Sequence, residues 1–444
     1  MKKIVKRLAA MLCVIGLFVV CEALLRYLLI DDAKNYTRYS RYNIHELYHS
    51  EQNIDILFVG SSHSVVSLIP EITDYVFGQY TFNAGTAGQR MDGSFAMIQE
   101  AADYHHINHI YLEMYYAFCS DYAYKDRTLS DLEYTYLISD YMRPSVRKMK
   151  YLLNASSKEY YMNSFIPATR NWEQLFDPEY MKSILRQKNT DAYKNYEWVG
   201  GDFENRGYVY TAGVVADDKF WNAEAYYDMT STLRAGGDSD WRRSLQCIID
   251  FCRKNGIELT LFSTPMPEWT IAGIQYQQYI DMCRRIAEEY GIEYYDFNLC
   301  REEYFDANDR SLFSDEDHMN NSGAMKFSVL FAKFFTGQLP DQRGEIFYET
   351  YDEKLAAEAA CVYGIAGPAA DESGSVNRCR IISNREQGME YRITVIPQDG
   401  ETVILQDYDG NRDFTLPAGE TGMLYIDWRM ADQPNESGRI ETVY

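Results

Sequence analysis

Short apolar runs alternate along residues 53–338 with longer segments whose apolar residues recur at helical spacing. The short runs end in Gly, Asn or other polar residues and predict β-strands, whereas the longer segments predict amphipathic helices. Strands that alternate with helices are typical of an α/β fold with a parallel sheet covered on both faces, whose ligands bind at the carboxyl ends of the strands. The predicted strands cover residues 53–60, 79–85, 107–116, 257–265 and 292–298, and the predicted helices cover residues 70–78, 93–106, 240–256, 274–291 and 322–337.

Two stretches depart from this alternation. Residues 116–238 are rich in tyrosine and tryptophan and predict an insertion of helices and loops. Its aromatic rings either stack on sugars or pack the insertion onto the core, and both interpretations stay open. After residue 345 a predicted linker helix (351–364) leads into segments of alternating polarity with Asp-Gly turns, which predict a small antiparallel β domain. The predicted domains are an anchor at 1–30, an α/β domain at 31–344 that contains the insertion, and a β-rich domain at 345–444.

The N-terminus joins a basic cluster to an apolar run from Leu8 to Ile30 that only Glu22 and Arg26 interrupt. The run is long enough to cross a bilayer, and its basic flank is expected on the cytoplasmic side. A cleavable signal peptide and a buried core helix are the alternatives, but no small-residue cleavage site follows the run. The sequence therefore predicts a single-pass cell-membrane protein that contacts the membrane through residues 8–30, with the bulk of the chain extracytoplasmic.

Charge and cysteine content exclude several classes of function. Lys and Arg number 43 and Asp and Glu number 66, a net charge of −23, so nucleic acid is not an expected partner. The cysteines outside the anchor are odd in number and scattered, which is not a disulfide framework, although Cys361 and Cys379 could form one bridge. No CxxC spacing indicates a metal site, and no metal or cofactor is predicted.

The stretch DILFVGSSHSVV, residues 55–66, places a candidate nucleophile at the end of the first predicted strand. A serine that follows a strand and a glycine can stand at a helix N-terminus, where backbone N–H groups stabilise a developing oxyanion. Such a serine needs a base, and the candidate lies in FSDEDHMNNSGA, where Asp315 and His318 precede the last predicted helix. An Asp three residues before a His can accept the Nδ1 proton, which leaves Nε2 free to take the serine proton. In a parallel sheet the two segments would converge on one rim.

On these residues the chain resembles the SGNH, or GDSL-type, hydrolase superfamily over about residues 52–338, without the insertion. Gly60-Ser61-Ser62 is similar to the GDS block of that family, which makes Ser62 the nucleophile and puts a serine in place of the usual Asp. FNAGTAGQ resembles the second block and implies an oxyanion donor, with Gly88 as the match by spacing and Gly85 as the second choice. The resemblance also implies a flavodoxin-like, three-layer parallel-sheet fold.

The segment SDEDHMNNSGA resembles the last block of the same superfamily. The match implies that His318 is the base and Asp315 its carboxylate partner. Asp317 adjoins the histidine at the wrong spacing and ranks below Asp315.

The third block of the superfamily is where this chain departs from the pattern. The family has an Asn oxyanion donor there, whereas IYLEMYYAF has none and Ala117 falls near its place. Glu113 and Tyr115 are the polar groups in reach and could contact the substrate. Tyr115, Tyr116 or a tyrosine of the insertion could substitute as a donor. His63, beside the nucleophile, either caps or packs as a loop residue, or contacts the substrate or serves as an oxyanion-side donor.

A membrane-anchored subset of the superfamily is similar to this chain: the DltD-like proteins of teichoic-acid D-alanylation and the proteins of alginate-type O-acetylation. The resemblance implies a serine-dependent acyl esterase or O-acyltransferase that acts on cell-surface polysaccharide or another envelope polymer. The implied partners are an acylated glycan or envelope polymer and a membrane-bound O-acyltransferase. The alternative is a catalytically impaired scaffold that binds glycan or such an acyltransferase, because the third-block Asn is missing.

Overall fold

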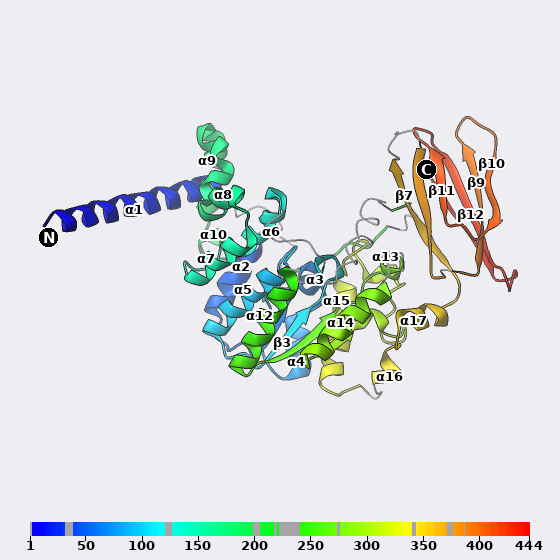
Figure 1. The fold of residues 1–444 in the computed structure, drawn as a ribbon, viewed down its shortest axis with the longest axis horizontal. Coiled ribbons are helices and arrows are strands. Elements are labelled where there is room, and N and C mark those ends of the chain that lie inside the picture. Colours follow the sequence, from blue (N-terminus) through cyan, green and yellow to red (C-terminus); the bar gives the residue numbers. More distant parts are fainter. Residues whose placement is uncertain are drawn as a thin grey trace.

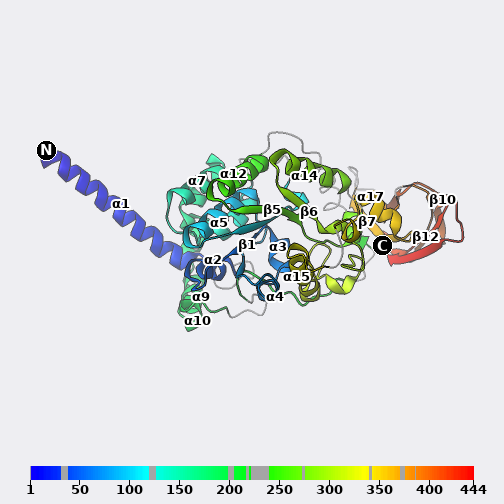
Figure 2. The same ribbon diagram turned by 90° about the horizontal axis from the view of Figure 1, so that it is seen from below.

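Figures 1 and 2 show the fold in a computed structural model of the 444-residue chain. The structure describes residues 2–31, 39–119, 127–198, 205–216, 220–221, 240–272, 276–339, 343–370, 376–385 and 387–444.

A five-stranded parallel sheet forms the centre of the main body, in the order β2-β1-β3-β5-β6. Its strands are β1 (Ile56–Val59), β2 (Thr81–Asn83), β3 (His109–Glu113), β5 (Glu258–Ser263) and β6 (Glu293–Asp296). The central strand β1 is buried at every position, as expected where helices cover both faces. All five predicted strands are present, which confirms the mixed α/β class with a parallel sheet. Each is shorter than its apolar run, because the residues after the strand turn away into loops.

Helices cover both faces of the sheet, with α5, α12 and α14 on one side and α3, α4 and α15 on the other (Figure 2). Their bounds are α3 (Ser62–Ser67), α4 (Pro70–Phe77), α5 (Met91–Tyr104), α12 (Asp240–Asn255), α14 (Tyr276–Tyr290) and α15 (Asn321–Phe335). Gly78, Gly256 and Gly291 follow α4, α12 and α14 with φ between 60° and 69°, a conformation that glycine adopts without strain. The predicted helix ends at these glycines are therefore confirmed. Short connections that follow the sheet strands are the 3₁₀ turns η2 (Tyr116–Phe118), η6 (Phe297–Leu299) and η7 (Arg310–Leu312).

The described part of the insertion is mainly helical, as the sequence predicted. Its elements are α6 (Leu129–Ser139), α7 (Val146–Ala155), η4 (Lys158–Tyr160), α8 (Tyr161–Phe165), η5 (Pro167–Phe176), α9 (Pro178–Lys188), α10 (Asp191–Lys194) and β4 (Phe220–Trp221). Tyr136, Tyr151 and Tyr208 are buried; Tyr151 and Tyr208 pack the insertion onto the body, whereas Tyr136 contacts Ser164 and Arg170 within the insertion. Together with α2 (Ser40–His49), helices α7 to α10 form the end of the body from which α1 (Lys2–Leu29) leaves (Figures 1 and 2). Helix α1 is long and apolar enough to cross a membrane.

The C-terminal domain is a β-sandwich of two four-stranded sheets, β10-β9-β12-β13 and β11-β8-β7-β4. Its strands are β7 (Val362–Ala370), β8 (Val376–Ser383), β9 (Met389–Pro397), β10 (Val403–Asp409), β11 (Asp413–Pro417), β12 (Gly422–Met430) and β13 (Ser437–Val443). A separate apolar core, including Ile381 from one sheet and Ile426 from the other, lies between them. Cys361 and Cys379 are free thiols, so the bridge considered from the sequence is not formed.

Two details of this region differ from the sequence pattern. The linker helix is shorter than predicted, because α17 (Tyr351–Ala357) ends before Cys361 and residues 362–364 already belong to β7. The pairing is also not wholly antiparallel, because β4 of the insertion adds to β7 in the parallel sense. Helices α16 (Arg343–Ile346) and α17 precede the sandwich, and Lys354 of α17 forms a buried ion pair with Glu268 of the main body.

Candidate active site at the carboxyl edge of the sheet

Ser62 is the first residue of α3 and follows β1 after a two-residue turn. Ser61 caps the helix: its side chain accepts the backbone N–H of His63, while its own N–H and Oγ–H donate to Oε2 of Glu113 at 2.8 and 3.0 Å. Gly60 is required at this turn, because a Cβ there would lie 2.5 Å from Cβ of Glu113. The local sequence therefore brings the end of β1 against β3 and leaves Ser62 partly exposed at the edge of the sheet.

His318 reaches Ser62 from the loop that precedes α15. Its Nε2 lies 2.8 Å from Oγ of Ser62, and its Nδ1 lies 3.1 and 3.2 Å from the two carboxylate oxygens of Asp315. The same carboxylate accepts the backbone N–H groups of Asp317 and His318 at 2.8 and 2.7 Å. Hydrogen bonds from its own loop and from the imidazole thus hold the Asp315 carboxylate in place. The bond to Nδ1 orients Nε2 of His318 toward Ser62. The structure brings together Ser62, His318 and Asp315, the three residues that the sequence predicted as candidates for catalysis.

The charges around His318 favour its protonated form. Burial would lower the pKa of His318, but the hydrogen bond to Asp315 and the charges of Asp317 and Asp315 outweigh it and raise the pKa above the ordinary value. Burial would likewise raise the pKa of Asp315, but the hydrogen bond with His318 and the backbone N–H donors lower it. An imidazole that carries a proton easily can take one from an attacking serine hydroxyl.

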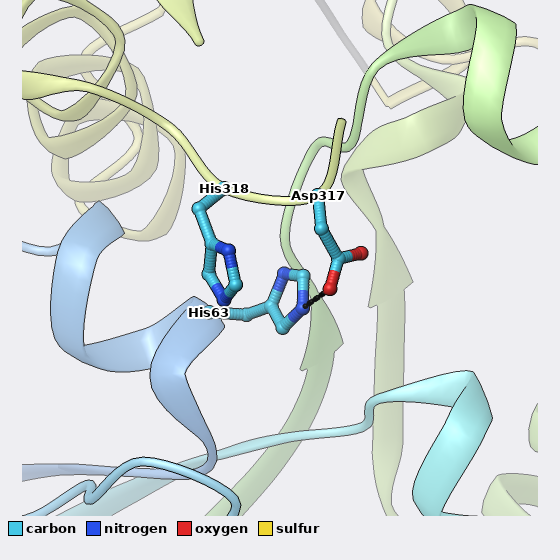
Figure 3. A group of neighbouring side chains, drawn as sticks. All are labelled: His63, Asp317 and His318. Atoms are coloured by element: carbon cyan, nitrogen blue, oxygen red, sulfur yellow. Dashed lines mark hydrogen bonds and ion pairs between the residues drawn. The ribbon is translucent and has the colours of Figure 1, made fainter. Parts of the chain in front are cut away.

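A second histidine–aspartate pair, His63 and Asp317, lies beside His318 (Figure 3). Nε2 of His63 is 3.3 Å from Oδ2 of Asp317, and the same carboxylate oxygen accepts the hydroxyl of Tyr115 at 2.9 Å. The His63 ring stacks on the His318 ring, with centroids 4.8 Å apart, and contacts the Tyr115 ring at 4.1 Å. Burial would raise the pKa of Asp317, but the charge and hydrogen bond of His63 lower it to about 2.

These contacts answer part of what the sequence left open about three residues. His63 is only 2% exposed, so it packs against His318 and Tyr115. Glu113 is 4% exposed and binds Ser61, and its pKa is raised chiefly by burial. Direct contact of His63, Glu113 or Tyr115 with substrate stays a prediction. In the structure, all three side chains contact the triad or residues next to it.

His63, Asp317 and His318 are also residue types that bind zinc, and their ligand atoms lie within 4.8 Å of one another. The two imidazole rings are stacked, with only 24° between their planes, so their in-plane lone pairs lie in nearly parallel planes and do not converge on one ion. A shared ion would require the rings to turn and Nε2 of His318 to leave Ser62. The present geometry therefore favours proton transfer over metal binding.

The two candidate oxyanion glycines differ in what their N–H groups do. The N–H of Gly85 donates to Oδ1 of Asn83 at 3.1 Å. Within the described residues, the N–H of Gly88 has no hydrogen-bond acceptor, and Gly88 has a positive φ of 61°. An oxyanion needs a free N–H, which Gly88 has and Gly85 lacks in this arrangement; which glycine serves as the donor stays a prediction. A Cβ at Gly88 would lie 2.3 Å from the Tyr134 ring of the insertion, which makes glycine necessary there.

Among residues 114–119, which the structure describes after β3, none is an Asn that could take the third donor position. Ala117 lies in η2, as the sequence indicates. The Tyr115 hydroxyl, a possible substitute, donates to Asp317, and Tyr116 is only 1% exposed. A third oxyanion donor from either tyrosine would therefore require a change in its present contacts.

Sequence reasoning missed the support that the insertion gives to the His318 loop. Hydrogen bonds that connect residues 208–215 to residues 313–321 include Tyr208 Oη to Asn321 Oδ1 (2.8 Å), Thr211 Oγ1 to the Met319 carbonyl (2.9 Å) and the Val215 N–H to the Phe313 carbonyl (2.9 Å). The partners lie about a hundred residues apart, and nothing in their local pattern signals the pairing.

Asn320 is a second residue that the sequence analysis did not single out. Its Oδ1 caps α15 by accepting the N–H groups of Ser322 and Gly323. Its Nδ2 lies within hydrogen-bond distance of the Gly213, Ser311 and Phe313 carbonyls. The signal that could have found it is an Asn directly before a predicted helix, which is a preferred N-cap residue.

A cavity of about 730 Å³ lies between α5, α7 and α12. Arg147, Tyr151 and Asp240 are among its lining residues, and none of the triad residues is. The cavity is therefore distinct from the candidate active site.

Comparisons with known proteins do not identify the chain. No family model matches it, and no curated protein matches it. Twelve chains of solved structures match, among them a Cellulomonas fimi endo-beta-1,4-mannanase double mutant at 12% identity. That alignment covers 93% of this chain and 98% of the mannanase with a TM-score of 0.17, a value that carries no argument about fold or function.

Proposed function

We propose that this protein is a serine-dependent acyl esterase or O-acyltransferase of the SGNH type. The observation that carries the proposal is the hydrogen-bonded series Ser62–His318–Asp315, with Ser62 Oγ 2.8 Å from His318 Nε2. The strand order of the sheet supports it, since second-first-third-fourth-fifth is the order of flavodoxin-like folds, whose ligands bind at the carboxyl edge.

The chemistry would proceed in two transfers. His318 Nε2 takes the proton of Ser62 Oγ as that oxygen attacks the acyl carbonyl, and the N–H groups of Ser62 and Gly88 stabilise the oxyanion. The bond to the alcohol breaks, the alcohol leaves with the proton from His318, and the acyl group stays on Ser62. Water or a sugar hydroxyl then attacks the acyl-serine and gives its proton to His318. The acyl–Oγ bond breaks, His318 returns the proton to Ser62 Oγ, and the free acid or the new ester is released.

The proposed substrate is an acylated cell-surface polysaccharide or envelope polymer. Support comes from α1, which is long and apolar enough to span a membrane and carries four of its five basic residues at the N-terminal end. Under the positive-inside rule, the rest of the chain lies outside the cytoplasm, next to such polymers. A membrane-bound O-acyltransferase is the proposed source or recipient of the acyl group.

A catalytically impaired scaffold is the second candidate. The observation in its favour is the absent third donor: Ala117 stands where the resemblance expects Asn, and the Tyr115 hydroxyl is bound to Asp317. One oxyanion donor typically contributes about 2.7–4 kcal/mol to transition-state stabilisation. Such a protein would bind glycan or the acyltransferase without turnover.

Covalent labelling of the full-length protein with a fluorophosphonate ester separates the two candidates. We expect an adduct on the wild type, its loss in Ser62→Ala, and a much slower reaction in His318→Ala. His49→Ala, which changes an exposed histidine on α2, is the matched control and should label normally. A wild-type protein that melts cooperatively yet forms no adduct would refute the enzyme and favour the scaffold. Partition of a preformed acyl-enzyme between water and an added sugar alcohol then distinguishes hydrolysis from transfer.

A further inference from the structure

The C-terminal end of α1 is bound by side chains of the insertion. The last carbonyls of a helix have no partner within the helix, and here three side chains of the insertion supply donors. Asn171 Nδ2 and Tyr180 Oη each donate to the Leu29 carbonyl at 2.9 Å, and Lys188 Nζ donates to the Ile30 carbonyl at 2.6 Å. Elements η5 and α9 are therefore fixed to the point where α1 leaves the body.

The length of α1 places this junction at a membrane surface. Residues 3–21 of α1 are exposed along their whole length, and contact with the body begins at Glu22. The exposed apolar part, residues 8–21, spans about 21 Å, so residues 22–27 are needed to complete the roughly 30 Å of a bilayer's hydrocarbon core. When residues 8–27 fill that core, the elements packed against residues 22–30 lie in its outer part and at the boundary between lipid and water.

Large apolar side chains are exposed on η5 and on α8, which packs against η5. Phe176 and Trp172 of η5 are 81% and 61% exposed, and Met162 of α8 is 59% exposed. Phe165 and Leu175 extend this set. Aromatic residues are enriched where a protein meets the interface of a bilayer, and clustered exposed apolar groups mark a surface that contacts lipid or protein.

The charge of this region is opposite to that of the rest of the outer chain. Residues 143–194 contain ten Lys and Arg and five Asp and Glu, whereas the whole chain has a net charge of −23. Several of the cations, including Lys150, Lys158 and Arg186, are exposed. Basic residues together with aromatic and apolar ones are the combination that binds anionic lipid surfaces.

We propose that residues 162–176 insert into the interface of the anionic bilayer that holds α1, and that the exposed basic residues of 143–194, such as Lys150, Lys158 and Arg186, contact its headgroups. Figures 1 and 2 agree that helices α7 to α10 form the end of the body from which α1 leaves. The insertion would then hold the α/β body in a fixed orientation on the membrane, so that α1 is not a flexible tether. This proposal does not depend on the chemistry of Ser62.

Photolabelling of the unsubstituted full-length protein in nanodiscs tests the contact. The discs contain lipids with a diazirine in the acyl chain, and the labelled sites are mapped by mass spectrometry. We expect label in α1, the internal positive control, and in residues 162–176. Tyr75 of α4, which is 91% exposed, is the negative control. Label in α1 without label in 162–176 would overturn the proposal and leave this surface to a protein partner.

The lipid composition tests the charge argument. We expect at least about twofold more label in 162–176 with phosphatidylglycerol than with phosphatidylcholine alone, and a smaller difference at high salt. Equal label in both lipids would overturn the electrostatic part of the proposal.

Tryptophan quenching gives an independent measure of depth. The chain has six tryptophans, so the emission of Trp172 is obtained as the difference between the wild type and Trp172→Phe. We expect brominated lipids to quench this difference signal, whereas the signal obtained in the same way from Trp428→Phe in the β-sandwich stays unquenched. An unquenched Trp172 signal would overturn insertion.

Discussion

The Asp317 carboxylate is bound to His63, with 3.3 Å between Oδ2 and Nε2, whereas the neighbouring Asp315 carboxylate is bound to Nδ1 of His318. Two histidine–aspartate pairs thus stand side by side, and only one of them contacts Ser62. Because the two carboxylates are only two residues apart, the conformation of the loop determines which histidine each of them contacts. In this loop the Asp315 carboxylate also accepts two backbone N–H groups. This division of roles leads to the first prediction.

Asp315→Asn and Asp317→Asn should differ in their effect on the labelling of Ser62. Asp315→Asn removes the acceptor that selects the His318 tautomer, and we expect the rate to fall at least about 10³-fold. Asp317→Asn leaves that acceptor in place and should reduce the rate less than about tenfold. The Asp317 charge helps to raise the pKa of His318, and the reactive form of His318 is neutral. Removal of that charge should therefore shift the rise of rate with pH to lower pH. Equal losses in both variants would contradict the assignment.

Asp317 should also make stability depend on pH in the acid range. Its pKa is lowered from 3.8 to about 2, so its contribution is complete above about pH 4 and is lost as the pH falls toward 2. A full shift of this size corresponds to roughly 2 kcal/mol, but the side chain is one-third exposed and screened by water, so we expect about 1 kcal/mol. The measurement is the melting temperature of wild type and Asp317→Asn between pH 2 and 7. Their difference should vanish at the acid end, and Asp399→Asn, on an exposed turn, should show no such trend. A difference that is constant with pH would contradict the prediction.

Glu113 should act through Ser61. In Glu113→Ala the buried N–H and hydroxyl of Ser61 lose their acceptor, which should cost about 1–3 kcal/mol and slow the labelling of Ser62. Glu113→Gln keeps an acceptor oxygen and should stay closer to the wild type in both melting temperature and labelling rate. If Glu113→Gln melted normally but failed to label, the carboxylate would contact the reacting group directly, as one interpretation of the sequence holds.

Asn320 should hold the His318 loop through both ends of its amide. Asn320→Ala removes the cap of α15, worth about 1 kcal/mol, together with the donor to the Gly213, Ser311 and Phe313 carbonyls. Asn320→Asp keeps the cap but turns a carboxylate oxygen toward those carbonyls, so it should melt no higher than Asn320→Ala. Labelling of Ser62 should slow about tenfold or more in both, because the base is displaced. An Asn320→Asp variant with wild-type melting and labelling would show that the donor contributes nothing.

Much of the α/β body could be predicted from local pattern. Apolar runs such as that before Gly60 predicted the strands, and glycines such as Gly78 and Gly256 marked helix ends, because burial and backbone conformation act over a few residues. The β-sandwich was predicted less completely. Strand β7 follows so closely on α17 that residues 351–364 read as one helix, and the strand that completes its sheet comes from residues 220–221 of the insertion.

The sequence by itself determined which residues were chemically able to form the site: Ser62 after a strand, and Asp315 three residues before His318. Only the tertiary structure decided that Asp317 pairs with His63, that Asn83 occupies the N–H of Gly85, and that residues 208–215 support the His318 loop. The physical reason is that spacing along the chain specifies periodicity and local turns. A hydrogen bond between residues 254 positions apart, such as that of His63 and Asp317, depends on how strands and loops pack against one another.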